Sequence, residues 1–265
     1  MSAPEPVTPT ATRVLAPNPG PMTLEGTNTW VLRAPGAAGA VVVDPGPDDE
    51  AHLRRVAELG PVALIVLTHR HPDHAEGVGR LRALTGAPVA AADPELCAGA
   101  APLRDGEIRD DAGVEWAGVA TPGHTSDSFC LLLTGDRALL TGDTILGRGT
   151  TVVAHPDGRL ADYLDSLHRL RDLAATDIDT VLPGHGPIGQ NPLQMLDFYL
   201  AHRQERLDQI RAALAELGPR ASAPDVVRRV YADVDESLWP AAEASVRAQL
   251  DYLAERDAGP PGRRR

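Results

Sequence analysis

Three histidines and one aspartate lie within six positions of the segment LTHRHPDHAEG (residues 67–77), directly after an apolar run. Protonated imidazoles packed this densely repel one another, and neutral imidazoles are costly to bury without partners. In extended backbone, His69 and His71 point the same way, and a proline then ends the extension before Asp73 and His74. The segment therefore predicts four metal ligands in the pattern His-x-His-x-Asp-His.

Three later segments repeat one design, in which a predicted strand ends in a glycine-rich turn with one ligand-type side chain. They are TPGHTSDS, LLTGDTILG and VLPGHGP, which supply His124, Asp143 and His185. Glycine beside a ligand lets the backbone approach closely in tight turns. Seven nitrogen and oxygen ligands from four strand ends suit two zinc ions, Zn²⁺, which are the expected cofactors. Two such ions share a water and lower its pKa toward about 7, so a metal-bridging hydroxide is the expected nucleophile.

The ligand segments need strands whose ends meet in space. Short apolar runs bounded by Gly, Pro or Asp predict strands at 28–33, 40–44, 62–68, 87–91, 114–121, 128–134, 137–142 and 179–184. Helical patterns occupy 47–60, 77–86 and 160–174. So many strands with so few helices between them favour an α/β fold with sheets sandwiched between helices.

After about residue 190 the pattern is helical throughout. One apolar stripe along a long helix consists of Leu193, Leu196, Leu200, Leu207, Ile210, Leu214 and Leu217. Ser222 is expected to cap a second helix, and residues 235–258 predict a third. We therefore expect a catalytic domain at 1–190 and a C-terminal helical domain at 191–265.

The composition narrows the class of protein. A net charge of −12 argues against a broad basic surface for nucleic acid. No stretch approaches the roughly 18 apolar residues that cross a bilayer, and no signal peptide is evident, so we expect a cytoplasmic globular protein with no membrane partner. Cys97 and Cys130 fit no metal or redox spacing and are expected to be reduced thiols. His52, His155 and His168 lack partner spacing and are expected on the surface.

These motifs resemble those of the metallo-β-lactamase superfamily over about residues 15–190, with a match at every ligand position. The resemblance implies a four-layer αββα sandwich. It also implies two metal sites with a shared ligand: His69, His71 and His124 in one, Asp73, His74 and His185 in the other, and Asp143 between them. By the same resemblance Asp73 is catalytic, since it orients the nucleophile. Class B β-lactamases carry a cysteine where this chain has Asp143, so the oxygen bridge favours hydrolases of esters, thioesters and phosphodiesters.

The resemblance extends to residues around the ligands. It implies that Asp44 braces the metal loops and that Thr27 and Asn28 line the pocket. Thr68 and Thr125 flank ligands and are expected to hydrogen-bond them. Each has an ordinary structural alternative, since Asp, Asn and Thr are common in turns and at strand ends.

Three segments resemble one branch of the superfamily, the β-lactamase-like protein 2 branch: PMTLEGTNTWVL, TGDTILGRGTTVV and PGHGPIGQNPLQMLDFYLAHRQERLDQI. Its tail is a winged-helix-like unit, and its animal members are endoribonucleases that cut single-stranded RNA. The resemblance implies phosphodiester hydrolysis, with His202 and Arg203 as candidate substrate contacts and Arg206 nearby. This tail leaves little sequence for the two strands of a wing, so the wing is expected to be missing. Arg70 stands where many members have an aromatic residue.

Other functions compete with RNA cleavage. The same site would serve a hydrolase of small thioesters, esters or lactones, as in hydroxyacylglutathione hydrolases. A mononuclear iron dioxygenase would use only some of the ligands, and a nucleic-acid-binding regulator would need a closed structural metal site, which usually contains cysteine. The expected partner is an anionic or acyl substrate, with single-stranded RNA leading and a homodimer left open.

Overall fold

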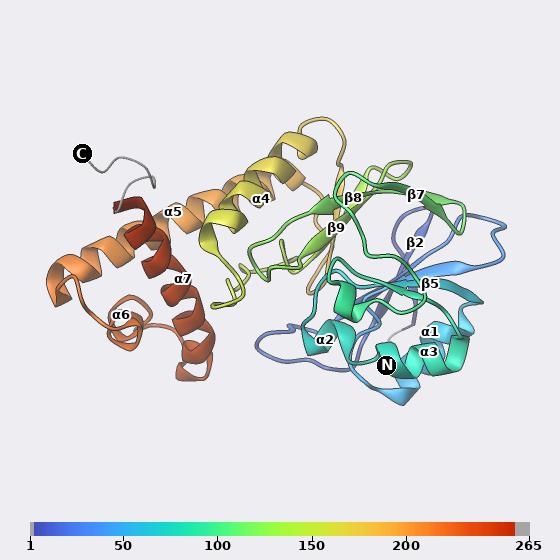
Figure 1. Cartoon of the computed structure of the whole chain (residues 1–265), viewed down its shortest axis with the longest axis horizontal. Helices are drawn as coiled ribbons and strands as arrows, with labels where there is room; N and C mark the ends of the chain where they lie inside the picture. The colour runs from blue at the N-terminus through green and yellow to red at the C-terminus, as the bar shows by residue number, and fades with distance from the viewer. Residues whose placement is uncertain (1–2, 258–265) are drawn as a thin grey trace.

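The computed structural model describes residues 3–257, which form two sheets with helices outside them (Figure 1). The first sheet has its six strands in sequence order. They are β1 (Glu5–Pro6), β2 (Ala11–Leu15), β3 (Asn28–Leu32), β4 (Ala40–Val43), β5 (Val62–Val66) and β6 (Val89–Ala90). Neighbours are antiparallel from β1 to β4 and parallel from β4 to β6.

The second sheet has five strands in the order β11-β10-β9-β8-β7. They are β7 (Ile108–Asp111), β8 (Val114–Ala120), β9 (Phe129–Leu133), β10 (Ala138–Gly142) and β11 (Thr180–Pro183). Only the β10–β11 pair is parallel among these strands. A buried cluster joins the inner faces of the two sheets, with Trp30 and Val43 from the first and Trp116, Phe129 and Leu131 from the second. Alternate residues of each strand supply this core, as the pleat requires.

Helices cover the outer faces of both sheets. On the first sheet, α1 (Glu50–Glu58) and α3 (Val78–Thr85) bury Leu53 and Leu81 against strand residues such as Ile65. On the second, α4 (Leu160–Ala174) buries Leu167 against Leu139 of β10. The layers are therefore helix, sheet, sheet and helix, which confirms the expected αββα sandwich.

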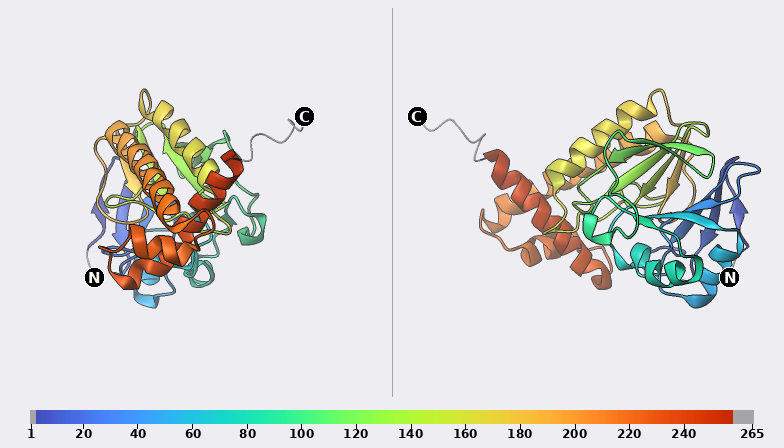
Figure 2. Two further views of the ribbon diagram at one scale, coloured as in Figure 1. Left: turned by 90° about the vertical axis from the view of Figure 1, so that its left-hand side faces the viewer. Right: turned by 45° about the vertical axis from the view of Figure 1, so that its right-hand side comes forward.

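The chain ends in a helical lobe at one side of the sandwich (Figures 1 and 2). It consists of the long helix α5 (Pro192–Leu217), then α6 (Ala223–Val230), the 3-10 turn η2 (Glu236–Leu238) and α7 (Trp239–Asp257). Ser222 caps α6 as expected, in a capping box with Asp225. Residues 191–257 contain no strand, which agrees with the expected loss of the wing.

The long helix ties this lobe to the sandwich. Leu196, Leu207 and Ile210 of α5 are buried in the same apolar cluster as α4 and β10, and α7 packs against α4, α5 and α6. The stripe is shorter than predicted, because Leu193 and Leu217, in the first and last turns of α5, are exposed. The domain boundary at residue 190 stays a prediction.

Candidate metal centre

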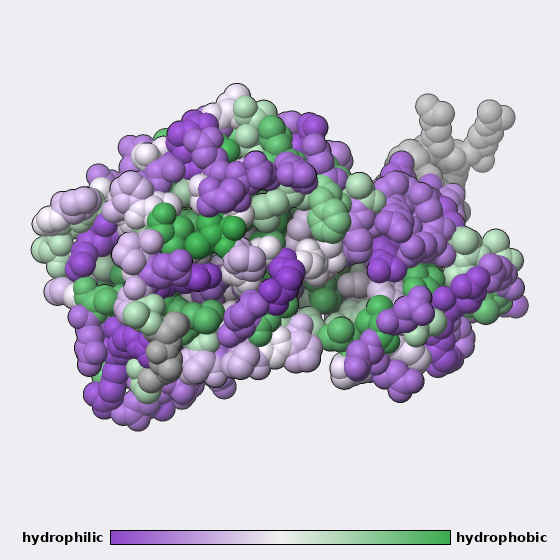
Figure 3. Space-filling view, turned by 180° about the vertical axis from the view of Figure 1, so that it is seen from behind, coloured by the Kyte–Doolittle hydropathy of each residue, from purple (hydrophilic) through white to green (hydrophobic). Residues whose placement is uncertain are grey.

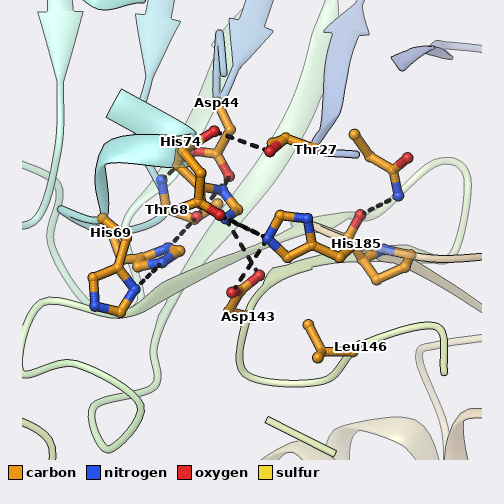
Figure 4. A network of polar contacts seen from close by, with 12 residues as sticks. Thr27, Asp44, Thr68, His69, His74, Asp143, Leu146 and His185 are labelled. Carbon is orange, nitrogen blue, oxygen red and sulfur yellow. Dashed lines mark hydrogen bonds and ion pairs between the residues drawn. The ribbon is translucent and has the colours of Figure 1, made fainter. Parts of the chain in front are cut away.

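Four strand ends deliver the seven predicted ligands to one place. Figure 4 labels four of them: His69, His74, Asp143 and His185. After β5 the chain carries His69 and His71, and then the short helix α2 (Pro72–Ala75), which holds Asp73 and His74. The turns after β8, β10 and β11 supply the other three. Segments far apart in the sequence thus meet at the edge of the sandwich, and the structure brings all seven side chains together.

The first group consists of His69, His71 and His124. Nε2 of His69 lies 3.1 Å from Nδ1 of His71, and Nε2 of His124 lies 3.0 Å from the same atom. The three nitrogens converge on one point, as ligands of a single ion do.

The second group consists of Asp73, His74 and His185. Nε2 of His185 lies 3.1 Å from Nε2 of His74 and 3.0 Å from Oδ2 of Asp73. Asp143 lies between the groups, with Oδ1 3.4 Å from Nε2 of His74 and Oδ2 3.8 Å from Nε2 of His124. Oδ2 also lies 3.5 Å from Nε2 of His185, so this carboxylate lies next to ligands of both groups, as a bridging ligand does.

Residues behind the ligands hold the imidazole rings in place by accepting hydrogen bonds from Nδ1. Thr68 donates its hydroxyl to Asp44 at 2.7 Å, so the same oxygen accepts from Nδ1–H of His69 at 3.0 Å. The Asp44 carboxylate also accepts from Nδ1–H of His74 at 2.8 Å. Asp44 thus braces two ligand segments, and both rings turn Nε2 inward.

The rings of His124 and His185 are held in the same way by backbone carbonyls. Nδ1–H of His124 donates to the carbonyl of Val152 at 2.6 Å, and Nδ1–H of His185 donates to that of Gly26 at 3.2 Å. Their Nε2 atoms also face inward. A ring that keeps its proton on Nδ1 binds a metal through Nε2, and metal binding displaces any proton there.

The inward atoms fit divalent cations. Nε2 of His69 lies 3.1 Å from Nδ1 of His71, and Nε2 of His74 lies 3.1 Å from Nε2 of His185, so each pair of nitrogens is close enough to ligate one cation. Oδ1 of Asp143 is buried and has no hydrogen-bond partner among the described residues. Five imidazoles and two carboxylates are ligands that suit zinc. This donor set implies a metal cofactor.

Burial and charge set the protonation of the site. Burial lowers the pKa of His124 to about 4 and that of His69 well below its usual value, so both rings are neutral at pH 7. Burial also acts to lower the pKa of His185, but the carboxylates of Asp143 and Asp73 outweigh it and raise this pKa to about 9. Burial acts to raise the pKa of Asp143, yet His185 and His74 hold it well below its usual range. Asp143 is therefore ionised, as a ligand must be.

Two glycines allow the ligand segments to pack this closely. A Cβ at Gly184 would lie 2.6 Å from Oδ1 of Asp143 and 2.7 Å from Cε1 of His74. Gly142 has φ +47, and its Cβ would lie 2.4 Å from Oγ1 of Thr68. Any side chain at either position would displace the site.

The remaining predicted residues lie behind the ligands. Thr27 is buried and donates to the carbonyl of Asp73 at 3.0 Å (Figure 4), and Asn28 donates to the carbonyls of Pro183 and Gly186 at 3.0 Å each. Both support backbone next to ligands and do not line the cleft described below. Thr125 shares a hydrogen bond of 2.8 Å with Ser128 and stabilises the turn of His124.

The surface prediction for His52 was wrong. Its ring is fully buried, with Nε2 3.0 Å from Oγ1 of Thr29, and burial lowers its pKa to about 4. His155 is half-buried and lies 3.1 Å from Asp251, while His168 is exposed. Both cysteines are free thiols, as expected.

A cleft of about 270 Å³ adjoins the metal centre and includes His124 and Asp143 in its lining. Its walls come from the catalytic domain and the helical lobe, and most are apolar: Leu24, Leu146, Tyr231, Val234, Leu238 and Ala242. Seen from behind, the surface is hollowed where the two lobes meet, and apolar side chains lie in the hollow (Figure 3). His202 and Arg203 also line the cleft, as does Arg206. The residues of α7 were missed, because nothing in a helical pattern tells which face closes a cleft.

Comparison with known proteins agrees with this geometry. The family model "Metallo-beta-lactamase superfamily" matches residues 22–185. The chain therefore belongs to the metallo-β-lactamase superfamily and is a hydrolase of that class. A second model, "Beta-lactamase associated winged helix domain", matches residues 222–258.

Individual relatives are similar over most of the chain. The "Beta-lactamase-like protein 2 homolog" of Caenorhabditis elegans is 33% identical over 267 residues, covering 92% of this chain and 84% of its own. The "Atrochrysone carboxyl ACP thioesterase" of Aspergillus fumigatus is 33% identical over 223 residues, covering 80% and 67%. A metallo-beta-lactamase family protein from Thermus thermophilus has a similar structure, with a TM-score of 0.79, 25% identity and coverage of 94% and 95%. None of the described helices combines the length and apolar character needed to cross a membrane.

Proposed function

We propose that this protein is a dinuclear zinc hydrolase that cleaves a carboxylic thioester or ester with an apolar acyl group. The observation that carries the proposal is the cleft, whose walls combine aliphatic side chains with Asp143 and His124 of the metal centre. Ligand sites with apolar walls and a few polar groups favour small organic substrates. The relative named as an ACP thioesterase supports the same class.

Residues of the site would bind the metal ions, and one of them would also move the proton. His69, His71, His124, Asp73, His74, His185 and Asp143 would hold the ions. Two bound zinc ions supply a hydroxide nucleophile and positive charge that stabilises the oxyanion of the transition state. The Asp73 side chain is 29% exposed and that of Asp143 is 11% exposed, so Asp73 is the carboxylate that can reach an incoming water and take its proton. Burial acts to raise the pKa of Asp73, but His185 lowers it, so the base is ionised.

Cleavage of RNA phosphodiesters is the second candidate, supported by the basic residues Arg203 and Arg206 on the cleft wall. The acidic balance of the chain, −12, counts against strong backbone binding. Tyr231 is the aromatic side chain in the cleft lining, and the guanidinium of Arg206 covers it at 4.7 Å from the ring centroid. Little aromatic surface is left for stacking of bases, so this candidate ranks second.

A direct comparison of substrates tests the proposal. The zinc-loaded protein is incubated with acetyl to octanoyl thioesters and with single-stranded RNA, each with and without a chelator. We expect thioester turnover that the chelator and Asp143→Ala both abolish, whereas Asp105→Ala, at a surface carboxylate, retains it. Metal-dependent RNA cleavage without thioester turnover would favour the second candidate, and no turnover of either would reject both.

A further inference from the structure

Three neighbouring positions of α5 bring nitrogen-rich side chains to the cleft. His202, Arg203 and Arg206, here called the α5 basic cluster, all line it. They lie on the helical lobe, whereas the metal ligands lie on the sandwich. The metal centre does not use this cluster, so its charges need another explanation.

Arg203 is a buried cation with no anion beside it. Its residue is 3% exposed, one terminal nitrogen donates to the carbonyl of Thr151, and its guanidinium lies 5.1 Å from the ring centroid of Tyr163. Its Nε is buried without a hydrogen-bond partner, and no carboxylate of the described residues forms an ion pair with it. Burying an unpaired charge is costly, and an anion from outside would offset that cost.

Other arginines in the described chain do not share this condition. Arg148 lines the same cleft, but its side chain pairs with Glu25 at 2.7 Å. Arg82 and Arg104 have no ion pair among the described residues, but both are exposed to water. Arg33 also lines a surface hollow without an ion pair, but it too is exposed. Among the described arginines, Arg203 is therefore the one that is buried and has no carboxylate partner.

His202 and Arg206 also have unused hydrogen-bonding capacity. Burial lowers the pKa of His202 to about 4, so its ring is neutral at pH 7. Nε of Arg206 is always a donor and lies 3.4 Å from Nε2 of His202, which places the ring proton on Nδ1. That Nδ1 is buried and has no partner among the described residues. Arg206 also forms no ion pair with a described carboxylate.

We propose that the α5 basic cluster binds an oxyanion of the substrate, a carboxylate or a phosphate, apart from the bond that is cleaved. Both groups accept the charged N–H donors that the two arginines present. The inference rests on the proposed function only in taking the cleft as the substrate site. It adds that the substrate is amphipathic: apolar along the cleft walls and anionic at α5.

Calorimetric titration of the zinc-loaded protein tests this without any turnover. The probes are linear monocarboxylates from butanoate to decanoate, the dicarboxylates of the same lengths, and the matching acids with one terminal phosphonate. One carboxylate can bind the metal ions in every series, so the affinity gained from the second anion reports the α5 basic cluster. We expect a gain of about tenfold at one best length. The larger gain, with carboxylate or with phosphonate, identifies the natural group.

Variants show where the second anion binds. Arg206→Gln, and the double variant His202→Phe with Arg206→Gln, are expected to remove the gain, while the control Arg148→Gln keeps it. Thermal melting confirms that each variant is folded. No gain at any length in the parent protein, or an undiminished gain in the double variant, would overturn the proposal. These binding results stand even if neither thioester nor RNA is hydrolysed, so they are separate from a failure of the proposed function.

Discussion

Asp44 shows how one residue outside the ligand set positions two ligands, His69 through Thr68 and His74 directly. It accepts hydrogen bonds from the backbone and hydroxyl of Thr68 and from the ring of His74, and it adopts φ 51. Asparagine tolerates this backbone conformation, so Asp44→Asn removes the charge and one acceptor with little strain. Loss of such an outer partner usually costs 10–100-fold in metal affinity. The cluster of imidazoles that the sequence presents therefore depends on a carboxylate 25 positions upstream of the first histidine.

We predict that Asp44→Asn weakens metal binding by about 10–100-fold and leaves the fold intact. Competition with a chromophoric chelator measures the affinity, and circular dichroism checks the fold. Asp48→Asn is the matched control, because Asp48 is an exposed acid that pairs with Arg80 and touches no ligand. Equal affinities in the two variants would show that Asp44 serves only the turn.

His52 gives a prediction on pH and stability. The unfolded chain binds a proton at this ring near pH 6.5, but the folded chain does so only near pH 4, because burial lowers the pKa. Lower pH therefore favours the unfolded state between these values, and the contribution of the neutral ring is fully present above about pH 6.5. One proton corresponds to a slope of about 1.4 kcal/mol per pH unit.

Urea unfolding of the metal-free protein at pH 5–7 measures this slope. We expect the free energy of unfolding to fall more steeply with acid in the parent than in His52→Gln, by up to about 1.4 kcal/mol per unit. The difference between the two proteins cancels the titration of the other histidines. Parallel pH profiles would mean that folding does not lower the pKa of His52.

At the scale of elements, Arg70 joins three loops around the ligand segment that carries it. Its guanidinium lies 3.2 Å from Asp93, 3.3 Å from Asp127 and 3.8 Å from Asp157. The Asp127 side chain is 5% exposed, and its oxygens have no hydrogen-bond partner among the described residues. Arg70 therefore offsets the burial of this carboxylate, a role that differs from an aromatic side chain at a pocket mouth.

We predict that Arg70→Ala lowers the free energy of unfolding by about 2 kcal/mol, because it leaves Asp127 buried and unpaired. Adding Asp127→Asn should recover part of this loss, since a neutral amide is cheaper to bury. A double-mutant cycle by urea unfolding measures the coupling. Additive effects of the two substitutions would contradict this account. Arg80→Ala, in an exposed ion pair, is expected to change stability much less.

The sequence predicted those strands and ligands whose residue pattern lies within one short segment of the chain. Every predicted strand is present. The seven ligands could be read from the chain because four lie within six positions after an apolar run and the other three each follow a glycine at a strand end. Strands β1, β2 and β7 were missed: the segment Ile108–Asp111 has three charged residues in four and pairs only along the sheet edge. An edge strand of this kind forms because it pairs with its neighbour, and its hydropathy pattern does not predict that pairing. The burial of His52 against Thr29 is likewise a contact between distant segments.

At the scale of the whole molecule, the helical lobe reaches the metal centre through one loop. Arg203 of α5 donates to the carbonyl of Thr151, and Ser245 of α7 accepts from the backbone of Val153 at 3.2 Å. Between these two contacts lies Val152, whose carbonyl holds the ring of His124. The lobe thus supports a ligand and also provides one wall of the cleft. Helical periodicity predicted the lobe's helices but not this contact, which depends on packing between segments some fifty to ninety positions apart.

The wall formed by α7 should set which acyl groups are accepted. Ala241 and Ala242 line the cleft with small side chains, and phenylalanine at both positions would fill space that a long acyl chain needs. We predict that Ala241→Phe with Ala242→Phe raises KM for an octanoyl thioester by about tenfold or more, since a few methylenes are worth that much in an apolar pocket.

The KM for an acetyl thioester and the metal content of this variant should change little, because the metal ligands lie on other elements. Ala254→Phe, at an exposed position of the same helix, is the matched control. Equal loss for the short and long substrates would mean that the acyl group does not lie along α7, and that the lobe acts on catalysis only by holding the loop of His124.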